Sequence, residues 1–281
     1  MSEPKGPKAW AIFFSKVWGD RFPVEPDVIA LEYSARYADP VRRIEPLDVP
    51  LDEFEGGLFA RSGKWLIVYN RRIRAPGRKR FTVAHEFGHY MLHRQGAVAF
   101  RCSQNDILDR SSPAAMRREH EANEFASYLL MPIGDFRRQM GAHPPTLDLI
   151  AHCADRYGVS LTAAALKYVE FTERRVAVVV GREGFILWGR ASDAAYRSGI
   201  FWRRGDPLPA QSLAAKPSLA QDGEAGRAGV KWPPGVWRPD EEVVEMSLGS
   251  DAYDLSISLL VFPNDPPPRM YSADRSAGGI L

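Results

Sequence analysis

Apolar and polar residues follow the spacing of helices, and then of strands, along the first quarter of the chain. Residues 9–18 (AWAIFFSKVW) and 26–37 (PDVIALEYSARY) have the pattern of amphipathic helices, the second with Pro26 near its start. A linker rich in Pro and Asp is expected to follow, through Pro50. Residues 56–70 (GGLFARSGKWLIVYN) then predict two strands around a turn at 61–64.

Two long helices are predicted next. The first contains FTVAHEFGHYMLH (81–93) and follows a basic segment. The second, residues 116–132, comes after a polar stretch. Ser111 or Ser112 is placed to cap it, and Pro113 suits its first turn.

The pattern changes to strands in the C-terminal part of the chain. Residues 144–171 predict two or three short helices, and a change of composition near residue 172 predicts a domain boundary. The stretch 205–240 is rich in Pro, Gly and Ala and is expected to be mostly loop. Strands are expected at 174–180 and 184–189, as a hairpin across Gly181–Gly184, and at 241–248 and 253–262.

The composition is that of a soluble globular protein long enough for two domains. The chain has 281 residues, of which 45% are hydrophobic and 26% charged. Its net charge of +2 gives no global attraction toward nucleic acid or an anionic membrane. Cys102 and Cys153 form no disulfide framework, the N-terminus is no convincing signal peptide, and no stretch approaches the ~18 apolar residues of a membrane span. We therefore expect a cytoplasmic protein.

The sequence HEFGH (85–89) has the HExxH spacing of a metallopeptidase site. On a helix, His85 and His89 lie one turn apart on one face, so their imidazoles can converge on one zinc ion at about 2.0–2.1 Å. Glu86, beside that face, can take the proton of an activated water as the water attacks a carbonyl. The apolar residues of the helix share a different face, which serves the core: Ala84, Phe87, Gly88 and Met91.

His93 continues the four-residue spacing of histidines, but it cannot complete the same site. It lies eight residues from His85, which is roughly 12 Å along a straight helix. We expect His93 to form a hydrogen bond near the metal site rather than to bind the ion.

The third protein ligand is expected from the second long helix, which offers Glu119, His120, Glu121 and Glu124. At ~100° per residue, Glu119 and Asn123 fall on one edge of its apolar stripe, Glu121 falls on the other border, and Glu124 points outward. We choose Glu119 as the ligand, with Glu121 as the alternative. Asn123, one turn on, is expected to accept a hydrogen bond from a liganding imidazole.

These two segments together resemble the ImmA/IrrE family of metallopeptidases. The matching residues are FTVAHEFGHYMLH (81–93) and EHEANEFASYLLMP (119–132). The strand ending in IVYN (67–70) and the helical segment ending in YGVS (157–160) are also similar, so the resemblance covers about residues 24–170.

The resemblance implies a small zincin-like catalytic core with two histidines and a glutamate on the metal. By this resemblance His85 and His89 are ligands and Glu86 is the general base, with Glu119 carried over as the third ligand. The expected ion is Zn²⁺, with Mn²⁺ as the alternative. The family also implies a regulatory role in stress responses or in the induction of mobile elements, through removal of XRE-type helix-turn-helix repressors.

The predicted architecture is therefore an α+β fold in three parts. Residues 1–132 form a zincin-like metallopeptidase domain of helices and a short sheet, and residues 133–172 form a helical segment, similar to a helix-turn-helix, packed on that core. Residues 173–281 form a β-rich C-terminal domain with a sensory or partner-binding role.

Within the helical segment, residues 149–168 place Gly158 near the turn of a helix-turn-helix. The second helix offers few basic or amide side chains that could reach base edges, which favours packing against the catalytic core over DNA binding.

Three other features allow both a structural and a functional interpretation. Residues 56–70 are expected to supply the sheet edge to which a substrate strand adds, or to form an ordinary core strand pair. Four tryptophans of the C-terminal part are expected in its core, with a pocket lining as the alternative: Trp188, Trp202, Trp232 and Trp237. A basic run predicts a solvated loop, or else a dock for an acidic substrate segment or nucleic acid: Arg71, Arg72, Arg74, Arg78, Lys79 and Arg80.

The sequence thus predicts a metal-dependent endopeptidase of narrow specificity that cuts a regulatory protein, an XRE-type repressor by resemblance. Two alternatives stay open. One is a regulatory binding module with a structural metal site that sequesters a transcription factor. The other is a regulator that binds DNA directly through residues 149–168.

Overall fold

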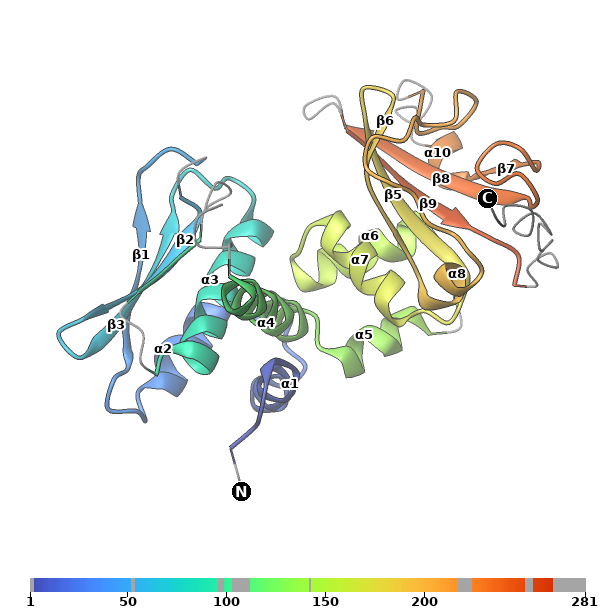
Figure 1. Cartoon of the computed structure of the whole chain (residues 1–281). Coiled ribbons are helices and arrows are strands. Elements are labelled where there is room, and N and C mark those ends of the chain that lie inside the picture. The colour runs from blue at the N-terminus through green and yellow to red at the C-terminus, as the bar shows by residue number, and fades with distance from the viewer. Residues whose placement is uncertain are drawn as a thin grey trace, which may run out of the picture. The chain divides into compact units, whose positions relative to one another are not determined.

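In the computed structural model the chain folds into two compact units (Figure 1). The first unit contains residues 1–143 and 149–167, and the second contains residues 144–148 and 168–281. The residues that the structure describes are 3–51, 54–95, 99–102, 112–141, 143–216, 224–250 and 255–264.

The first unit combines helices with a four-stranded sheet (Figure 1). Its helices are α1 (Pro7–Trp18), α2 (Pro26–Ser34), α3 (Pro76–His93), α4 (Pro113–Leu130) and α5 (Ile133–Met140). Two further helices, α6 (Leu147–Tyr157) and α7 (Leu161–Phe171), lie mostly within it. Its strands are β1 (Val41–Leu47), β2 (Gly56–Arg61), β3 (Lys64–Asn70) and β4 (Ala99–Cys102).

The sheet has the order β1-β3-β2-β4, in which β1 is parallel to β3 and the other pairs are antiparallel. The predicted β2–β3 hairpin is confirmed, with Arg61 opposite Lys64. The prediction of a linker through Pro50 is wrong in part, because strand β1 lies within that stretch. Strand β1 escaped prediction because its pattern lacks strict alternation and includes Pro46, a residue that sheets confine to edge strands and bulges.

The expectation that β2 and β3 supply a free sheet edge is also wrong. Both strands are paired on each side, so the outer strands among the described residues are β1 and β4. Strand β4 was not predicted, since its four residues are too few to show a periodicity. Among the described strands, the edges to which a strand could add are therefore those of β4 and β1, and the proline and two arginines of β1 are features that protect edges from pairing.

Helices α3 and α4 pack closely because one residue of their interface has no side chain. A Cβ on Gly88 would lie 3.0 Å from Cδ1 of Phe125 and 3.3 Å from the backbone of Ala122. Around this contact the rings of Phe14, Phe87 and Phe125 meet with centroids 5.2–6.1 Å apart, which joins α1 to both helices. The interface therefore belongs to the core of the first unit.

The caps of α4 follow the predicted chemistry. The Ser112 side chain accepts a hydrogen bond from the backbone N–H of Ala115, and Pro113 occupies the first turn. Ser111, the other predicted cap, lies outside the described residues. Helix α3 begins at Pro76, within the basic segment that was expected to lead into it.

The segment predicted to resemble a helix-turn-helix packs on the core of the first unit. Ala164 and Ala165 of α7 are buried, and the Lys167 ammonium lies 3.3 Å from the ring centroid of Tyr128 on α4. At the turn between α6 and α7, the carbonyl of Gly158 accepts a hydrogen bond from Arg80 on α3. The second helix therefore uses one face for internal packing.

A buried carboxylate links α5 to α6. Asp135 accepts hydrogen bonds from Arg156 at 2.7 and 3.1 Å, from the Tyr157 hydroxyl at 2.7 Å and from Arg138 at 2.9 Å. Burial alone would raise the pKa of Asp135, but the hydrogen bonds from Arg156 and Tyr157 outweigh it and hold the pKa below its usual range.

The second unit is built on a five-stranded antiparallel sheet of order β6-β5-β9-β8-β7. The strands are β5 (Val176–Arg182), β6 (Phe185–Ala191), β7 (Val230–Trp232), β8 (Val243–Ser250) and β9 (Leu255–Val261). Short helices α8 (Asp193–Arg197) and α10 (Glu224–Ala228) complete it. The predicted hairpin and the two later strands are confirmed, and the predicted α+β class with a β-rich C-terminal part is confirmed with them.

One face of this sheet carries an apolar core around a single carboxylate. Glu245, fully buried on β8, accepts hydrogen bonds from the backbone N–H groups of Leu213 and Ala214, from both Trp232 and Trp237 indoles, and from the Ser258 hydroxyl. These five donors are 2.7–3.1 Å away. Glu245 thereby fixes the loop at 213–214 and two of the four tryptophans.

Three of the four tryptophans that were predicted to lie in the core are found there. Trp237 is buried, Trp202 and Trp232 pack against the same apolar cluster, and the rings of Trp202 and Trp237 meet edge to face. Trp188, on β6, is partly exposed.

Within the described parts of the chain, the helices are all too short or too polar to cross a bilayer.

We expect Asp135→Asn to lower the free energy of unfolding by about 2 kcal/mol at pH 7, because three charge-assisted donors lose their anionic acceptor. Since the folded-state pKa of Asp135 is lower than that of the unfolded chain, its stabilisation is fully present above about pH 4 and is lost as the pH falls toward the folded-state pKa. Urea unfolding monitored by circular dichroism at pH 7 and near pH 3.5 measures both effects. Asp155→Asn, at an exposed site on α6, is the control. If Asp135→Asn lowers the free energy of unfolding by the same amount at both pH values, the stabilisation does not depend on the ionisation of Asp135 and the prediction is wrong.

We expect Glu245→Gln to destabilise the second unit by about 2–4 kcal/mol, because the amide nitrogen would face N–H donors that it cannot accept from. Thermal unfolding followed by tryptophan fluorescence measures this, since Trp232 and Trp237 report on the site. Glu242→Gln, a half-exposed partner of Lys231, should change stability by less than about 0.5 kcal/mol. Equal stability of the two variants would refute a structural role for Glu245.

Candidate metal centre

His85 is held in one orientation by α4. Its Nδ1 lies 2.9 Å from Oδ1 of Asn123, and an amide oxygen can only accept a hydrogen bond. Nδ1 of His85 therefore carries the proton, and Nε2 presents a lone pair when the ring is neutral. Asn123 was predicted in this position, one turn beyond Glu119.

His89 is oriented by a chain of two further residues. Its Nδ1 lies 3.1 Å from Nδ1 of His93, and Nε2 of His93 lies 2.9 Å from Oε2 of Glu121. Because the carboxylate accepts, His93 donates from Nε2 and accepts at Nδ1, so His89 donates from its own Nδ1. The chain thus leaves a lone pair on Nε2 of His89.

These two lone pairs face a third donor from α4. Nε2 of His85 lies 3.0 Å from Nε2 of His89, and the Glu119 carboxylate oxygens lie 3.4 Å and 3.2 Å from the two nitrogens. One ligand atom from each of these residues falls within 4.8 Å of the others. Two imidazole lone pairs and a carboxylate that converge in this way repel one another unless a cation lies between them, so the donor set fits a divalent metal ion.

The protonation of the three groups agrees with a site that attracts positive charge. Burial opposes a charge on His85, but the hydrogen bond to Glu119 and the charge of Glu86 outweigh it and raise the pKa of His85. Burial lowers the pKa of His89 to about 4, against the hydrogen bond to Glu119. Burial would raise the pKa of Glu119, yet its hydrogen bonds with both histidines bring it far below its usual range. The carboxylate is thus ionised, as a metal ligand must be.

Glu86 lies beneath the sheet next to the histidines. It is fully buried on α3, and its Oε1 would be only 3.0 Å from a Cβ built on Gly56 of β2. The same Cβ would lie 2.4 Å from Cγ2 of Thr82, one turn earlier on α3. The absence of a side chain at Gly56 therefore lets β2 approach α3 at the position of the Glu86 carboxylate.

The other acidic residues of α4 have different roles from Glu119. Glu121, the alternative ligand, contacts His93 instead, and Glu124 forms an ion pair with Lys8 at 3.1 Å, consistent with its predicted outward orientation. His120 has no place in the cluster of three ligands.

The basic segment 71–80 is paired in part with acidic residues of its own unit. Five of its six charged side chains contact acidic groups or an aromatic ring: Arg71 and Arg72 contact Asp48, Arg78 contacts Glu55, Arg80 contacts Glu25, and Lys79 lies over the ring of Tyr69. Four arginines of the run are thus held by acids of the same unit, which agrees with the structural interpretation.

The fold and the site together define a metallopeptidase domain of the HExxH type. Residues 44–168 match the family described as the IrrE N-terminal-like domain, peptidase family M78. This part of the chain is therefore a domain of the ImmA/IrrE family of metallopeptidases, as the sequence resemblance suggested. No curated protein matches the chain.

A solved structure extends the likeness to most of the chain. It is a transcriptional regulator of Mycobacterium tuberculosis, 14% identical, with a TM-score of 0.58 over 91% of this chain and 75% of that one. At this identity the likeness establishes the fold, including the β-rich second unit after the helical segment.

Two contributors to the site were not found from the sequence. Gly56 gave no signal, because only the packing of β2 over α3 shows that a side chain there would collide with Glu86. Glu121 was considered only as a ligand. Its contact with His93 was predictable in principle, since both residues flank the metal-binding positions on helices expected to pack together.

We expect substitutions of Glu119 and Glu121 to affect metal affinity differently. Glu119→Gln removes a ligand and should lower Zn²⁺ affinity by well over 100-fold, whereas Glu121→Gln weakens only the orientation of His89 and should lower it by about 10-fold. Competition with a chromophoric chelator measures both constants. Glu124→Gln on the same helix is the control, and a larger loss in Glu121→Gln than in Glu119→Gln would reverse the ligand assignment.

Proposed function

We propose that the first unit is a metal-dependent endopeptidase that hydrolyses one peptide bond in a regulatory protein. The observation that carries this proposal is the convergence of His85, His89 and Glu119 within 4.8 Å, beside the buried carboxylate of Glu86 on the same helix. The family match of residues 44–168 supports the same reaction class.

The residues divide the chemistry between holding an ion and moving a proton. His85, His89 and Glu119 would hold the ion, which when bound supplies Lewis-acid activation of a water molecule and of the scissile carbonyl. Glu86 removes the proton from the attacking water and passes it to the leaving nitrogen, so that one water is consumed and one amide bond is broken.

Zn²⁺ is the proposed ion, with Mn²⁺ as the alternative. Two imidazole nitrogens and one carboxylate oxygen form a set of three protein ligands that is typical of catalytic zinc. Oxygen-rich sites suit manganese better, and this one has a single protein oxygen donor.

An XRE-type helix-turn-helix repressor is the proposed substrate. The support is the family resemblance, together with the likeness of the fold to a protein described as a transcriptional regulator. Narrow specificity agrees with a sheet whose accessible edges are limited to β1 and β4 among the described strands. Cleavage of such a repressor would connect the metal site to transcription without direct contact between this protein and DNA.

We expect Glu86→Gln to retain metal but to lose proteolysis by about 10²–10⁴-fold, because the amide keeps the shape of the carboxylate and cannot accept the proton. Metal content by plasma mass spectrometry and cleavage of a co-expressed XRE-type repressor by gel electrophoresis measure the two properties. Glu55→Gln, which removes an acid that contacts Arg78 outside the metal cluster, is the control.

The same variant separates catalysis from sequestration. If Glu86→Gln binds metal and relieves repression as fully as the wild type, the protein acts by binding a transcription factor and the proposed peptidase activity is refuted.

A further inference from the structure

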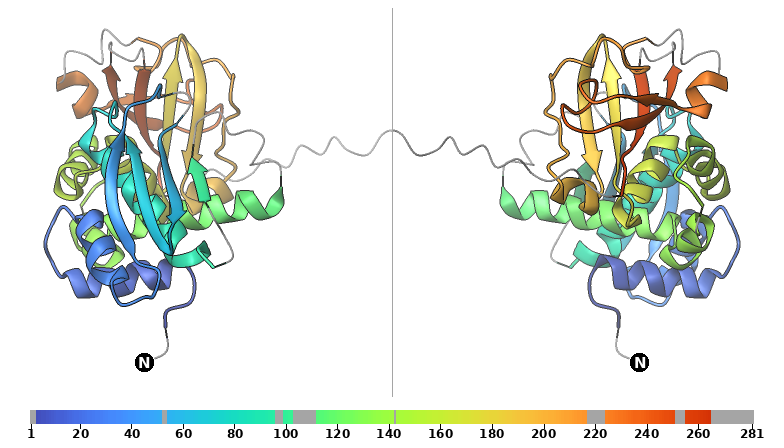
Figure 2. Two further views of the ribbon diagram at one scale, coloured as in Figure 1. Left: turned by 90° about the vertical axis from the view of Figure 1, so that its left-hand side faces the viewer. Right: turned by 90° about the vertical axis from the view of Figure 1, so that its right-hand side faces the viewer.

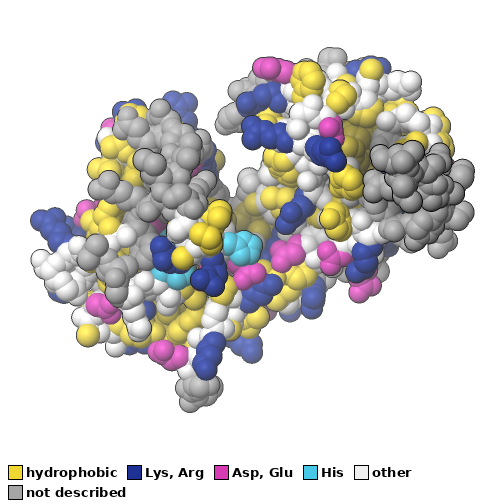
Figure 3. Space-filling view, viewed as in Figure 1, with side chains coloured by type: hydrophobic (Ala, Val, Ile, Leu, Met, Phe, Trp, Pro, Cys, Tyr) yellow, Lys and Arg dark blue, Asp and Glu magenta, His cyan; other side chains and the backbone are white. Residues whose placement is uncertain are grey.

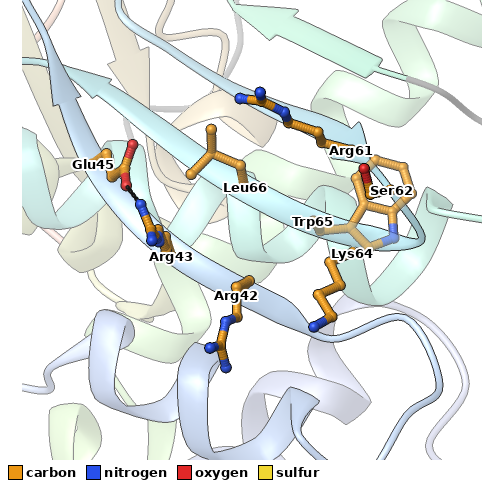
Figure 4. A pocket seen from close by; sticks show the side chains of 8 residues that line it. All are labelled: Arg42, Arg43, Glu45, Arg61, Ser62, Lys64, Trp65 and Leu66. Atoms are coloured by element: carbon orange, nitrogen blue, oxygen red, sulfur yellow. Dashed lines mark hydrogen bonds and ion pairs between the residues drawn. The ribbon is translucent and has the colours of Figure 1, made fainter.

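A second surface of the first unit, remote from the metal ligands, has the properties of a binding site. It is a concavity of about 440 Å³ on β1, β3 and the β2–β3 turn. We call it the basic pocket and define it by its lining residues: Arg42, Arg43, Glu45, Arg61, Ser62, Lys64, Trp65 and Leu66. Figure 4 shows Leu66 between the charged side chains, with Arg43, Arg61 and Lys64 on different sides of it.

The basic pocket opens on the sheet face that points away from α3. Side chains alternate between the faces of a strand, and the ring of Trp65 packs against Tyr90 of α3. Its neighbour Leu66 therefore points to the opposite face, together with Arg43, its partner across β1. In the left view of Figure 2 the strands of this sheet lie in front of the helices, so none of the described helices of the unit covers this face.

Positive charge in the basic pocket is poorly compensated. Among the described residues, Arg42, Arg61 and Lys64 have no ion-pair partner, and the one acid, Glu45, pairs with Arg43 at 3.1 Å. Arg61 and Lys64 are also directly opposite each other across the β2–β3 ladder, where like charges destabilise a sheet. Figure 4 shows their charged ends on different sides of Leu66, so acidic groups bound to each of them would reduce this repulsion.

The turn that joins Arg61 and Lys64 fixes the backbone positions of both residues. It consists of Ser62 and Gly63, both with positive φ, 51° and 71°. A two-residue turn of this type fixes the register of the hairpin, and serine is an uncommon residue for the first position because its side chain disfavours φ above zero. The Ser62 hydroxyl lines the basic pocket and supplies a neutral hydrogen-bonding group beside the two cations.

An excess of positive charge is not a property of the whole chain. The whole chain carries a net charge of only +2, and Figure 3 shows basic and acidic side chains interspersed over the visible face. A general affinity for polyanions is therefore not expected from the protein as a whole.

We propose that the basic pocket binds an acidic segment of a partner protein, in which carboxylates flank an apolar side chain. The carboxylates would contact Arg61 and Lys64, and the apolar side chain would cover the half-buried Leu66. A single-stranded nucleic acid fits less well, because the one aromatic residue of the lining, Trp65, is buried and offers no ring face on which a base could stack. This inference goes beyond the proposed peptidase activity and does not depend on it.

The test is binding of labelled peptides to the full-length protein by fluorescence anisotropy. A peptide that repeats Glu-Asp-Leu should bind the wild type, and its Gln-Asn-Leu counterpart should not. The double variant Arg61→Ala/Lys64→Ala should weaken binding by about 10-fold, since each exposed charge pair contributes a few-fold in affinity. Leu66→Thr should weaken it by about 3-fold through the loss of apolar contact.

The control removes the same net charge elsewhere. Lys16→Ala/Arg203→Ala alters two exposed cations outside the basic pocket and should change peptide affinity by less than about 2-fold. An equal loss in this control would overturn the proposal, as would unchanged binding in Arg61→Ala/Lys64→Ala or in Leu66→Thr.

A single-stranded oligonucleotide of the same net charge distinguishes the two kinds of partner. If it binds more tightly than the Glu-Asp-Leu peptide and depends on Arg61 and Lys64, the surface serves nucleic acid and the proposal is wrong. None of these readouts involves peptide cleavage, so they are separate from the outcome of the Glu86→Gln experiment.

Discussion

The close contact of α3 and α4 at Gly88 is the constraint on which the metal centre depends. Neither helix carries a complete site, because α3 supplies two imidazoles and α4 supplies the carboxylate. The donors can converge only if the two backbones approach closely, and any side chain at Gly88 would meet Phe125 and the backbone of Ala122. The glycine inside HEFGH therefore matters for geometry, whereas the residues around it matter for chemistry.

The polar groups around the site follow from the same packing. Buried histidines are costly unless their ring nitrogens have partners. Here Asn123 satisfies His85, and the pair of His93 and Glu121 satisfies His89. Asn123 lies on the facing helix α4, and His93 of α3 is itself held by Glu121 of α4. The contact between the two helices that brings the three candidate ligands together therefore also sets the tautomers of the two histidines. Such a network favours one arrangement of the donors before any ion binds.

The second unit relies on a comparable device for a structural purpose. Its core surrounds Glu245, whose carboxylate is saturated by five donors from strands and loops that are distant in sequence. At the candidate metal centre a carboxylate and two imidazole lone pairs converge, which is a donor set that fits a cation. At Glu245 the carboxylate meets only hydrogen-bond donors. The difference shows why a buried acid is by itself no indication of a functional site.

The sequence by itself determined the two long helices, the ligands His85 and His89 as candidates, the choice of Glu119 and the position of Asn123. It could do so because helical spacing is local, and four residues always return to the same face. Only the tertiary structure decided that Glu121 contacts His93, that Gly56 lies over Glu86, and that β2 and β3 are interior strands between β1 and β4. These are pairings between segments far apart in the chain, and they depend on which surfaces meet when the core forms, a question that local periodicity cannot answer.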